Sequence, residues 1–147
     1  MTDPKLFIEA NKERLLEELF GLLRIPSISA DPAYNADVAK CAAHIAEHMK
    51  SLGLDAVEIF PTEGHPIVYG ECLVDPHLPT VLVYGHYDVQ PADPIDLWDN
   101  DPFEPVIKTS KIHPDGAIFA RGACDDCLLY TSPSPRDAHE SRMPSSA

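Results

Sequence analysis

The sequence has no long apolar run and few basic residues, and each shortage excludes a class of protein. No stretch approaches the ~18 consecutive apolar residues that a membrane-spanning helix needs. The first residues, MTDPKLFIEA, lack a basic start followed by an apolar core, so they do not indicate a secretory signal. Lys and Arg total 11 against 24 Asp and Glu, a formal net charge of -13. This acidic balance argues against binding to nucleic acid or to an anionic membrane surface.

Cysteine is also scarce. The four cysteines are Cys41, Cys72, Cys124 and Cys127. Without a secretory signal, they are expected to be free thiols in a reducing compartment rather than a disulfide framework, so we expect a cytoplasmic protein. A length of 147 residues suits about one domain.

Two helices are predicted in the first third of the chain. The first should begin at Pro4, capped by Asp3, and end near 24–25, because the proline that follows disfavours helix in the residue before it. The second should run from about Ala36 to Leu52, with Gly53 as its C-terminal cap.

Short extended runs follow the helices. AVEIF (56–60) and PIVYGECL (66–73) are two of them, and TVLVYG (80–85) is a third. The third is continuously apolar and rich in β-branched residues, which predicts a strand buried on both faces of a parallel or mixed sheet. Farther on, VIKTSKIHPDGAIFARG predicts a hairpin that turns around 114–116. Helices followed by strands and a loop-borne site indicate an α/β domain.

HIAEH (44–48) matches the inverted zinc-protease pattern H-x-x-E-H, in which Glu47 would be the general base. On a helical wheel, however, both histidines and Glu47 lie opposite the apolar residues Val38 and Ile45. An ordinary solvated helix face is therefore the favoured interpretation.

Cys124 and Cys127 form a C-x-x-C pair, which can be half of a zinc site or a redox pair. The chain offers no second pair and no thioredoxin-like context. A chance match is therefore favoured.

YGHYDVQP (84–91) is the third candidate site. His86 follows the predicted strand at its C-terminal end, the edge where ligands bind in open α/β sheets. Asp88 comes two residues later, and a carboxylate beside a metal-bound imidazole can hold its other nitrogen and fix its tautomer. Spacing alone supports a metal site and a plain strand-end histidine equally.

Three sequence blocks, taken together, favour the metal site over the plain strand-end histidine. They are LLRIPSIS, VLVYGHYDVQPADPIDLWDNDPFEPVIK and GAIFARGACDD, in this order. Across residues 5–126 the chain resembles the dizinc peptidase family of carnosinase-like dipeptidases, aminoacylases and carboxypeptidase G, especially its bacterial dipeptidases. The resemblance implies the N-terminal part of an α/β zinc-peptidase catalytic domain, truncated, with two helices and then a mixed sheet.

The resemblance also implies a function and its site residues. His86 resembles a ligand of one zinc ion, Asp88 the acid that orients it, and Asp125 the carboxylate that bridges two zinc ions, whereas Asp126 is not usually a ligand. The intact parent would hydrolyse a dipeptide or small amide with a metal-activated water and a glutamate base. The alternatives are an N-acyl amino acid deacylase of the same family and a non-catalytic binding domain that has lost its metal site.

The sequence departs from the family pattern after the acid pair, where Cys127 replaces a lysine. The glutamate pair, the remaining ligands and the lid domain, through which the parent would form a homodimer, do not follow. With only His86 and Asp125 as ligands, we expect this polypeptide to bind zinc weakly and to be inactive.

The last segment, 127–147, can be written in codons that resemble two sequencing-library adapters in one frame. We therefore expect residues 1–126 to be a partial catalytic domain and 127–147 a non-native, disordered tail. A genuine Ser- and Pro-rich tail is the alternative.

Overall fold

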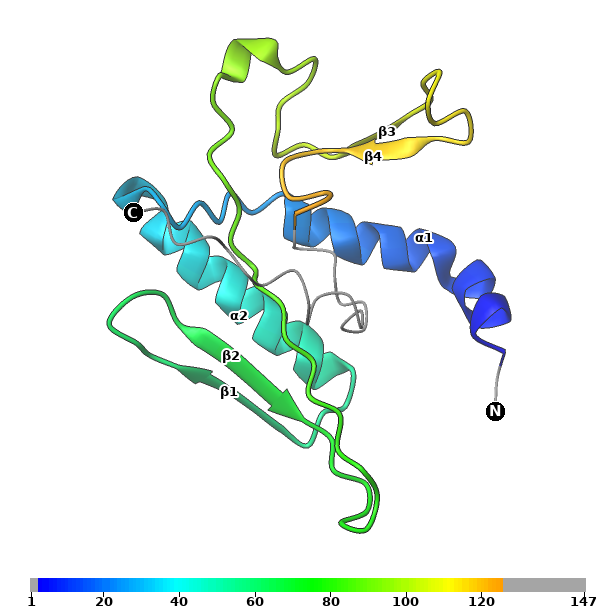
Figure 1. Ribbon diagram of the computed structural model, residues 1–147, viewed down its shortest axis with the longest axis vertical. Helices are drawn as coiled ribbons and strands as arrows, with labels where there is room; N and C mark the ends of the chain where they lie inside the picture. Colours follow the sequence, from blue (N-terminus) through cyan, green and yellow to red (C-terminus); the bar gives the residue numbers. More distant parts are fainter. Residues whose placement is uncertain (1–2, 126–147) are drawn as a thin grey trace, which may run out of the picture.

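The computed structural model describes residues 3–125 (Figure 1). Two helices, α1 and α2, come first, and two hairpins, β1–β2 and β3–β4, follow. None of the helices between residues 3 and 125 is long and apolar enough to cross a membrane. The predictions for Asp126, Cys127 and the segment 127–147 lie outside the described residues.

Helix α1 spans Pro4–Leu23, as predicted. The Asp3 side chain caps it by accepting a hydrogen bond of 2.9 Å from the Lys5 backbone N–H. Only the last turn, with Leu22 and Leu23, is buried. The helix therefore contributes to the core through its C-terminal end alone.

Helix α2 spans Asn35–Ser51 and follows a 3-10 turn at Pro32–Tyr34. Its buried face consists of Val38, Cys41, Ala42, Ile45 and Ala46. The chain leaves the helix through Gly53 with φ of +81°, a left-handed conformation that glycine adopts without steric cost. The predicted cap is therefore confirmed.

Strands β1 (Ala56–Phe60) and β2 (Ile67–Glu71) pair antiparallel and lie along α2 (Figure 1). Gly70 lies where β2 passes closest to the end of that helix. A Cβ atom at this position would lie 2.7 Å from Leu54 Cδ2 and 2.9 Å from Met49 Sδ. A larger residue at position 70 would therefore require the Leu54 and Met49 side chains to move.

The second hairpin joins β3 (Val106–Lys108) to β4 (Ala117–Phe119), as predicted (Figure 1). In its turn the Gly116 N–H donates to the His113 carbonyl, and Gly116 has φ of +96°. A 3-10 turn at Ile95–Leu97 lies in the loop that leads to this hairpin.

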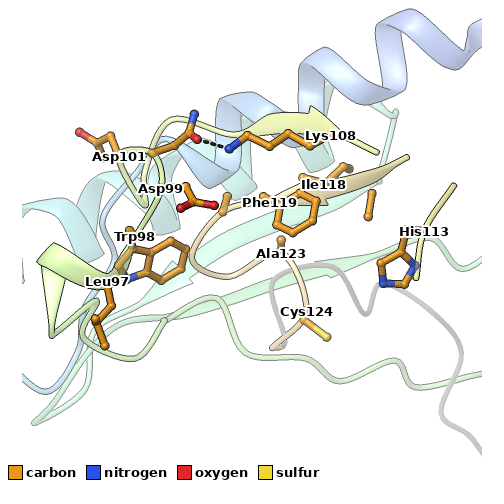
Figure 2. A pocket seen from close by; sticks show the side chains of 13 residues that line it. Leu97, Trp98, Asp99, Asp101, Lys108, His113, Ile118, Phe119, Ala123 and Cys124 are labelled. Carbon is orange, nitrogen blue, oxygen red and sulfur yellow. Dashed lines mark hydrogen bonds between the residues drawn. The ribbon is translucent and has the colours of Figure 1, made fainter. Parts of the chain in front are cut away.

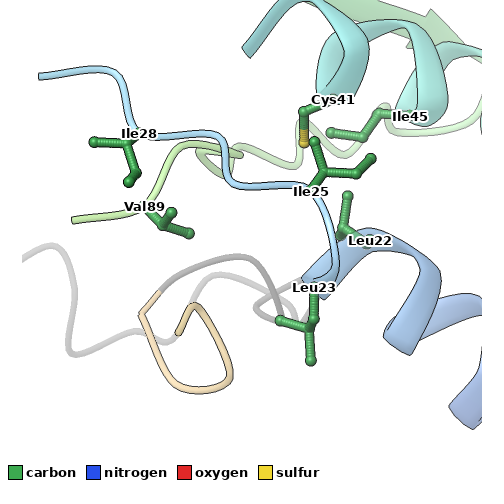
Figure 3. Packing of buried hydrophobic residues seen from close by; sticks show 7 residues of the cluster. All are labelled: Leu22, Leu23, Ile25, Ile28, Cys41, Ile45 and Val89. Carbon is green, nitrogen blue, oxygen red and sulfur yellow. The ribbon is translucent and has the colours of Figure 1, made fainter. Parts of the chain in front are cut away.

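The core is one small cluster where the end of α1, the segment that follows it and α2 meet (Figure 3). Its members are Leu22, Leu23, Ile25, Ile28, Cys41, Ile45 and Val89. Val89 joins the cluster through an isolated parallel bridge to Ile28. This bridge attaches a late segment of the chain to an early one.

The α/β class is confirmed, but the strand expected at 80–85 is wrong for the described structure. This segment has no strand partner, and Val81, Leu82 and Tyr84 are 76%, 81% and 84% exposed. A strand forms only where a neighbouring backbone accepts and donates its hydrogen bonds. Within residues 3–125 the strands pair with each other in two antiparallel hairpins, and the parallel pairing is limited to the Ile28–Val89 bridge.

Candidate metal centre

The loop that carries His86 and Asp88 is fixed by the segment that follows α1. The Ser27 hydroxyl donates to the Tyr87 carbonyl over 2.7 Å, and the Val89 N–H donates to the Ser27 carbonyl over 3.0 Å. Ser27 is fully buried. The conformation of the loop is therefore set by contacts to residues about sixty positions earlier.

The half-buried Tyr87 and the buried Cys41 make further contacts that hold this loop. The Tyr87 hydroxyl donates to the Pro66 carbonyl over 2.6 Å, and the Cys41 thiol contacts the Tyr87 carbonyl at 3.6 Å. Burial raises the pKa of Tyr87 to about 12 and that of Cys41 to about 11. Cys41 is thus held as a neutral thiol, which makes it neither a nucleophile nor a metal ligand.

His86 has its Nδ1 atom next to two oxygens of Asp88. The distance from Nδ1 is 3.0 Å to Asp88 Oδ1 and 3.1 Å to the Asp88 backbone carbonyl. Carboxylate and carbonyl oxygens can only accept, so Nδ1 must carry the proton. In the neutral imidazole the lone pair is then on Nε2, the atom available to a metal ion.

The Nε2 atom of His86 faces Asp125, which follows the second hairpin. The distance from Nε2 to Asp125 Oδ1 is 3.6 Å. His86 and Asp88 are each 39% exposed and Asp125 is 77% exposed, so the centre is open to solvent. The three residues predicted from the sequence are therefore brought together in space.

The donor pair suits a divalent zinc-type ion in chemistry and spacing. Two ligand atoms on one tetrahedral zinc lie roughly 3.3–3.5 Å apart, given Zn–N and Zn–O bonds of about 2.0–2.2 Å. The 3.6 Å between His86 Nε2 and Asp125 Oδ1 is close to this range. Among residues 3–125, however, no group of three or more His, Cys, Asp or Glu side chains could hold a metal ion. Further ligands would have to come from elsewhere.

Sequence reasoning missed Ser27 and Ser29 in this centre. The Ser29 hydroxyl donates to the Oδ2 atom of Asp88, the carboxylate oxygen that His86 does not use. Serines two positions apart in an extended segment point to the same side. The spacing of the two serines in IPSIS indicated that they share one side of the segment. It did not indicate which part of the chain they would contact.

The H-x-x-E-H motif does not form a site. His44 and Glu47 are exposed, and Glu47 pairs with Lys50 at 2.9 Å. Partial burial lowers the pKa of His44, and the nearby His48 and Lys40 lower it further. The prediction of a solvated face is confirmed. Of the C-x-x-C pair, Cys124 is an exposed free thiol and Cys127 lies outside the described residues.

A pocket of about 660 Å³ is lined by side chains of the Trp98 loop and of the second hairpin (Figure 2). It reaches Cys124, the neighbour of Asp125. The Arg121 guanidinium stacks over the Trp98 ring at 5.1 Å. Neither His86 nor Asp88 lines this pocket, so it is separate from the histidine and the carboxylate of the candidate centre.

Comparison with known proteins finds one matching family model and several similar relatives. Residues 82–129 match the model of "Peptidase family M20/M25/M40". The chain is 34% identical to "Cys-Gly metallodipeptidase DUG1" of Candida albicans, over 81% of this chain and 26% of that protein. It is 29% identical to "Beta-Ala-His dipeptidase" of Rattus norvegicus, over 82% of this chain and 26% of that protein.

A solved structure of the dipeptidase Dug1p from Saccharomyces cerevisiae superposes with a TM-score of 0.72 at 31% identity. The match covers 82% of this chain and 26% of that one. The chain thus spans about a quarter of the length of the curated relatives that it matches. Metallodipeptidase relatives imply a metal cofactor in this family. In sequence and in structure, the chain is thus similar to the corresponding part of proteins related to peptidase family M20/M25/M40.

Proposed function

We propose that this chain is the N-terminal part of a dizinc dipeptidase, in which His86 and Asp125 are metal ligands and Asp88 orients His86. The observation that carries the proposal is the pair of acceptors on Nδ1 of His86, which leaves Nε2 as the metal-binding atom facing Asp125. The intact parent would hydrolyse the peptide bond of dipeptides or related small amides.

The residues of this chain would prepare the centre rather than complete the reaction. Asp88 keeps the Nδ1 proton in place, and Asp125 supplies a carboxylate oxygen on the opposite side of the ring. Ser27 fixes the loop, so the imidazole is oriented before a metal arrives. Two zinc ions, when bound, would lower the pKa of a bridging water and polarise the scissile carbonyl.

The remaining ligands and the general base would lie outside residues 3–125, so the chain by itself would be inactive. Residues 1–126 would form a partial catalytic domain and 127–147 a non-native tail. The parent would be cytoplasmic, which the free thiols of Cys41, Cys72 and Cys124 support. It would be a homodimer through a lid domain, for which the family resemblance is the support.

Zinc titration of the 147-residue chain, followed by calorimetry, tests the metal role. We expect weak binding that His86→Ala removes. His44→Ala is the matched control, because His44 is also an exposed histidine and should leave binding unchanged. Equal binding by both variants would exclude His86 as a ligand.

Reading the source gene across codon 126 tests the parent. We expect the frame to continue into further acidic and histidine ligands. The protein encoded by that longer frame, loaded with zinc, should hydrolyse a dipeptide such as Cys-Gly. A source gene that encodes residues 127–147 and then stops would instead favour a binding domain.

A further inference from the structure

Asp88 is held at both of its carboxylate oxygens. Oδ1 accepts from His86 Nδ1 at 3.0 Å, and Oδ2 accepts from the Ser29 hydroxyl. A carboxylate bound at one oxygen can still rotate about its Cβ–Cγ bond. Bound at both, it keeps Oδ1 directed at the imidazole.

Ser29 can act as a fixed donor because its own position is determined by the fold. It directly follows Ile28, which makes the parallel bridge to Val89 in the core. Its backbone carbonyl accepts a hydrogen bond from His65 Nε2 over 3.0 Å. The hydroxyl is thus held between the core and the first hairpin, 59 residues before Asp88 in sequence.

We propose that Ser29 is a positioning residue of this metal centre, acting through Asp88 to set the tautomer and orientation of His86; the inference rests on the proposed function. The chain of contacts is Ser29 to Asp88 Oδ2, Asp88 Oδ1 to His86 Nδ1, and His86 Nε2 toward Asp125. Ser29 contacts Asp88 and is not one of the proposed ligands. Its effect should therefore be on readiness to bind metal, not on the number of ligands.

Removing the Ser29 hydroxyl should weaken the positioning of His86 without abolishing it. In Ser29→Ala the Asp88 carboxylate loses a donor and gains rotational freedom. The Asp88 backbone carbonyl still lies 3.1 Å from His86 Nδ1 and preserves part of the tautomer preference. Mutation of a residue that hydrogen-bonds a metal ligand typically lowers metal affinity about 10–100-fold. Because Ser29→Ala removes only part of the support of His86, we expect a loss of about tenfold.

The first measurement is ¹⁵N NMR of the histidine rings in the metal-free 147-residue chain at about pH 8.5, two units above the ordinary histidine pKa. The His86 signals are identified by their loss in His86→Ala. We expect the Nδ1-protonated form to predominate in the unmodified chain and in Ser29→Thr, which keeps the hydroxyl. Ser29→Ala should shift the population toward the Nε2-protonated form. An unchanged tautomer in Ser29→Ala would overturn the proposal.

The second measurement is zinc affinity of the same variants. We expect about tenfold weaker binding in Ser29→Ala, with rescue in Ser29→Thr. Ser51→Ala is the matched control, because it removes an exposed hydroxyl that bonds only the His48 carbonyl on α2. Ser29→Cys keeps the side-chain shape but has a weaker donor, so its zinc affinity should lie between those of the unmodified chain and Ser29→Ala. This variant replaces Ser29→Ala if Ser29→Ala does not fold.

The two proposals fail in different ways. Zinc affinity that is insensitive to His86→Ala would remove the proposed metal role, while the tautomer measurement would still decide whether Ser29 positions His86. Affinity that depends on His86 but is the same in Ser29→Ala would overturn the role of Ser29 alone.

Discussion

Ser27 and Tyr87, 60 residues apart in sequence, are joined by a hydrogen bond of 2.7 Å from the Ser27 hydroxyl to the Tyr87 carbonyl. Ser27 is fully buried, and the bond holds the loop between His86 and Asp88 against the segment after α1. The position of the candidate metal centre depends on this attachment.

Ser27→Ala should destabilise the chain by about 1–3 kcal/mol, because it removes a hydroxyl that is fully buried and donates a hydrogen bond to the Tyr87 carbonyl. Urea unfolding followed by circular dichroism measures the change. The same substitution at exposed Ser51 should stay within about 0.5 kcal/mol. Equal effects at the two positions would mean that the attachment does not contribute to stability.

Gly70→Ala should destabilise the first hairpin. The added methyl group would lie 2.7 Å from Leu54 Cδ2 and 2.9 Å from Met49 Sδ, and both side chains would have to move. We expect a cost of about 1 kcal/mol, because overpacking is partly offset by the better strand propensity of alanine.

Gly64→Ala is the control for this change, because its nearest contact would be 3.9 Å away. Thermal unfolding of both variants provides the comparison. A loss of stability at position 64 as large as that at position 70 would contradict the packing argument.

Leu82→Lys should reduce self-association of the chain. Leu82 is 81% exposed and lies in an apolar segment whose backbone has no strand partner within the described residues. An exposed apolar segment of this kind promotes edge-to-edge pairing between chains. Static light scattering against concentration measures the effect. Ile8→Lys, at an exposed position of α1 beyond the unpaired N–H groups of its first turn, should change association much less.

The stability of the chain should fall at high pH through Cys41. Burial raises its pKa from 9.0 to about 11, so the fold favours the protonated thiol. This contribution is fully present below pH 9 and is lost as the pH rises through about 11. Tyr87, whose burial raises its pKa from 10.0 to about 12, acts in the same direction at higher pH.

Urea unfolding at several pH values between about 8 and 11 tests this effect, with Cys41→Ala as the comparison. We expect a shallower pH dependence in the variant. Thiol reagents should also modify the exposed Cys72 and Cys124 well before Cys41. Modification of all three thiols at one rate would show that Cys41 is not protected.

Local signals predicted the local structure well. Asp3 and Pro4 start α1, Gly53 ends α2, and Gly116 lies in the turn of the second hairpin. Each depends on backbone conformation or capping over a few residues, which the sequence displays directly. The candidate residues of the site also came from short motifs.

Non-local features were harder to predict. The apolar pattern at 80–85 predicts a strand, but strand formation requires a partner that residues 3–125 do not provide. The bonds from Ser27 to Tyr87 and from Ser29 to Asp88 cross about sixty residues. A pair of serines in IPSIS carries no information about which distant group it will meet.

The Ile28–Val89 bridge has a consequence for the order in which the chain folds during synthesis. Both helices and the first hairpin are complete once residue 71 has left the ribosome, yet the contacts that tie the loop around His86 to Ser27 and Ile28 form only when residues 87–89 emerge. Closing so long a loop carries an entropic cost that grows only slowly with length, about 0.6 kcal/mol for each doubling. We therefore expect the nascent chain to acquire its helices before its metal-binding loop, so that the earliest folded stage is one that cannot yet capture a metal ion.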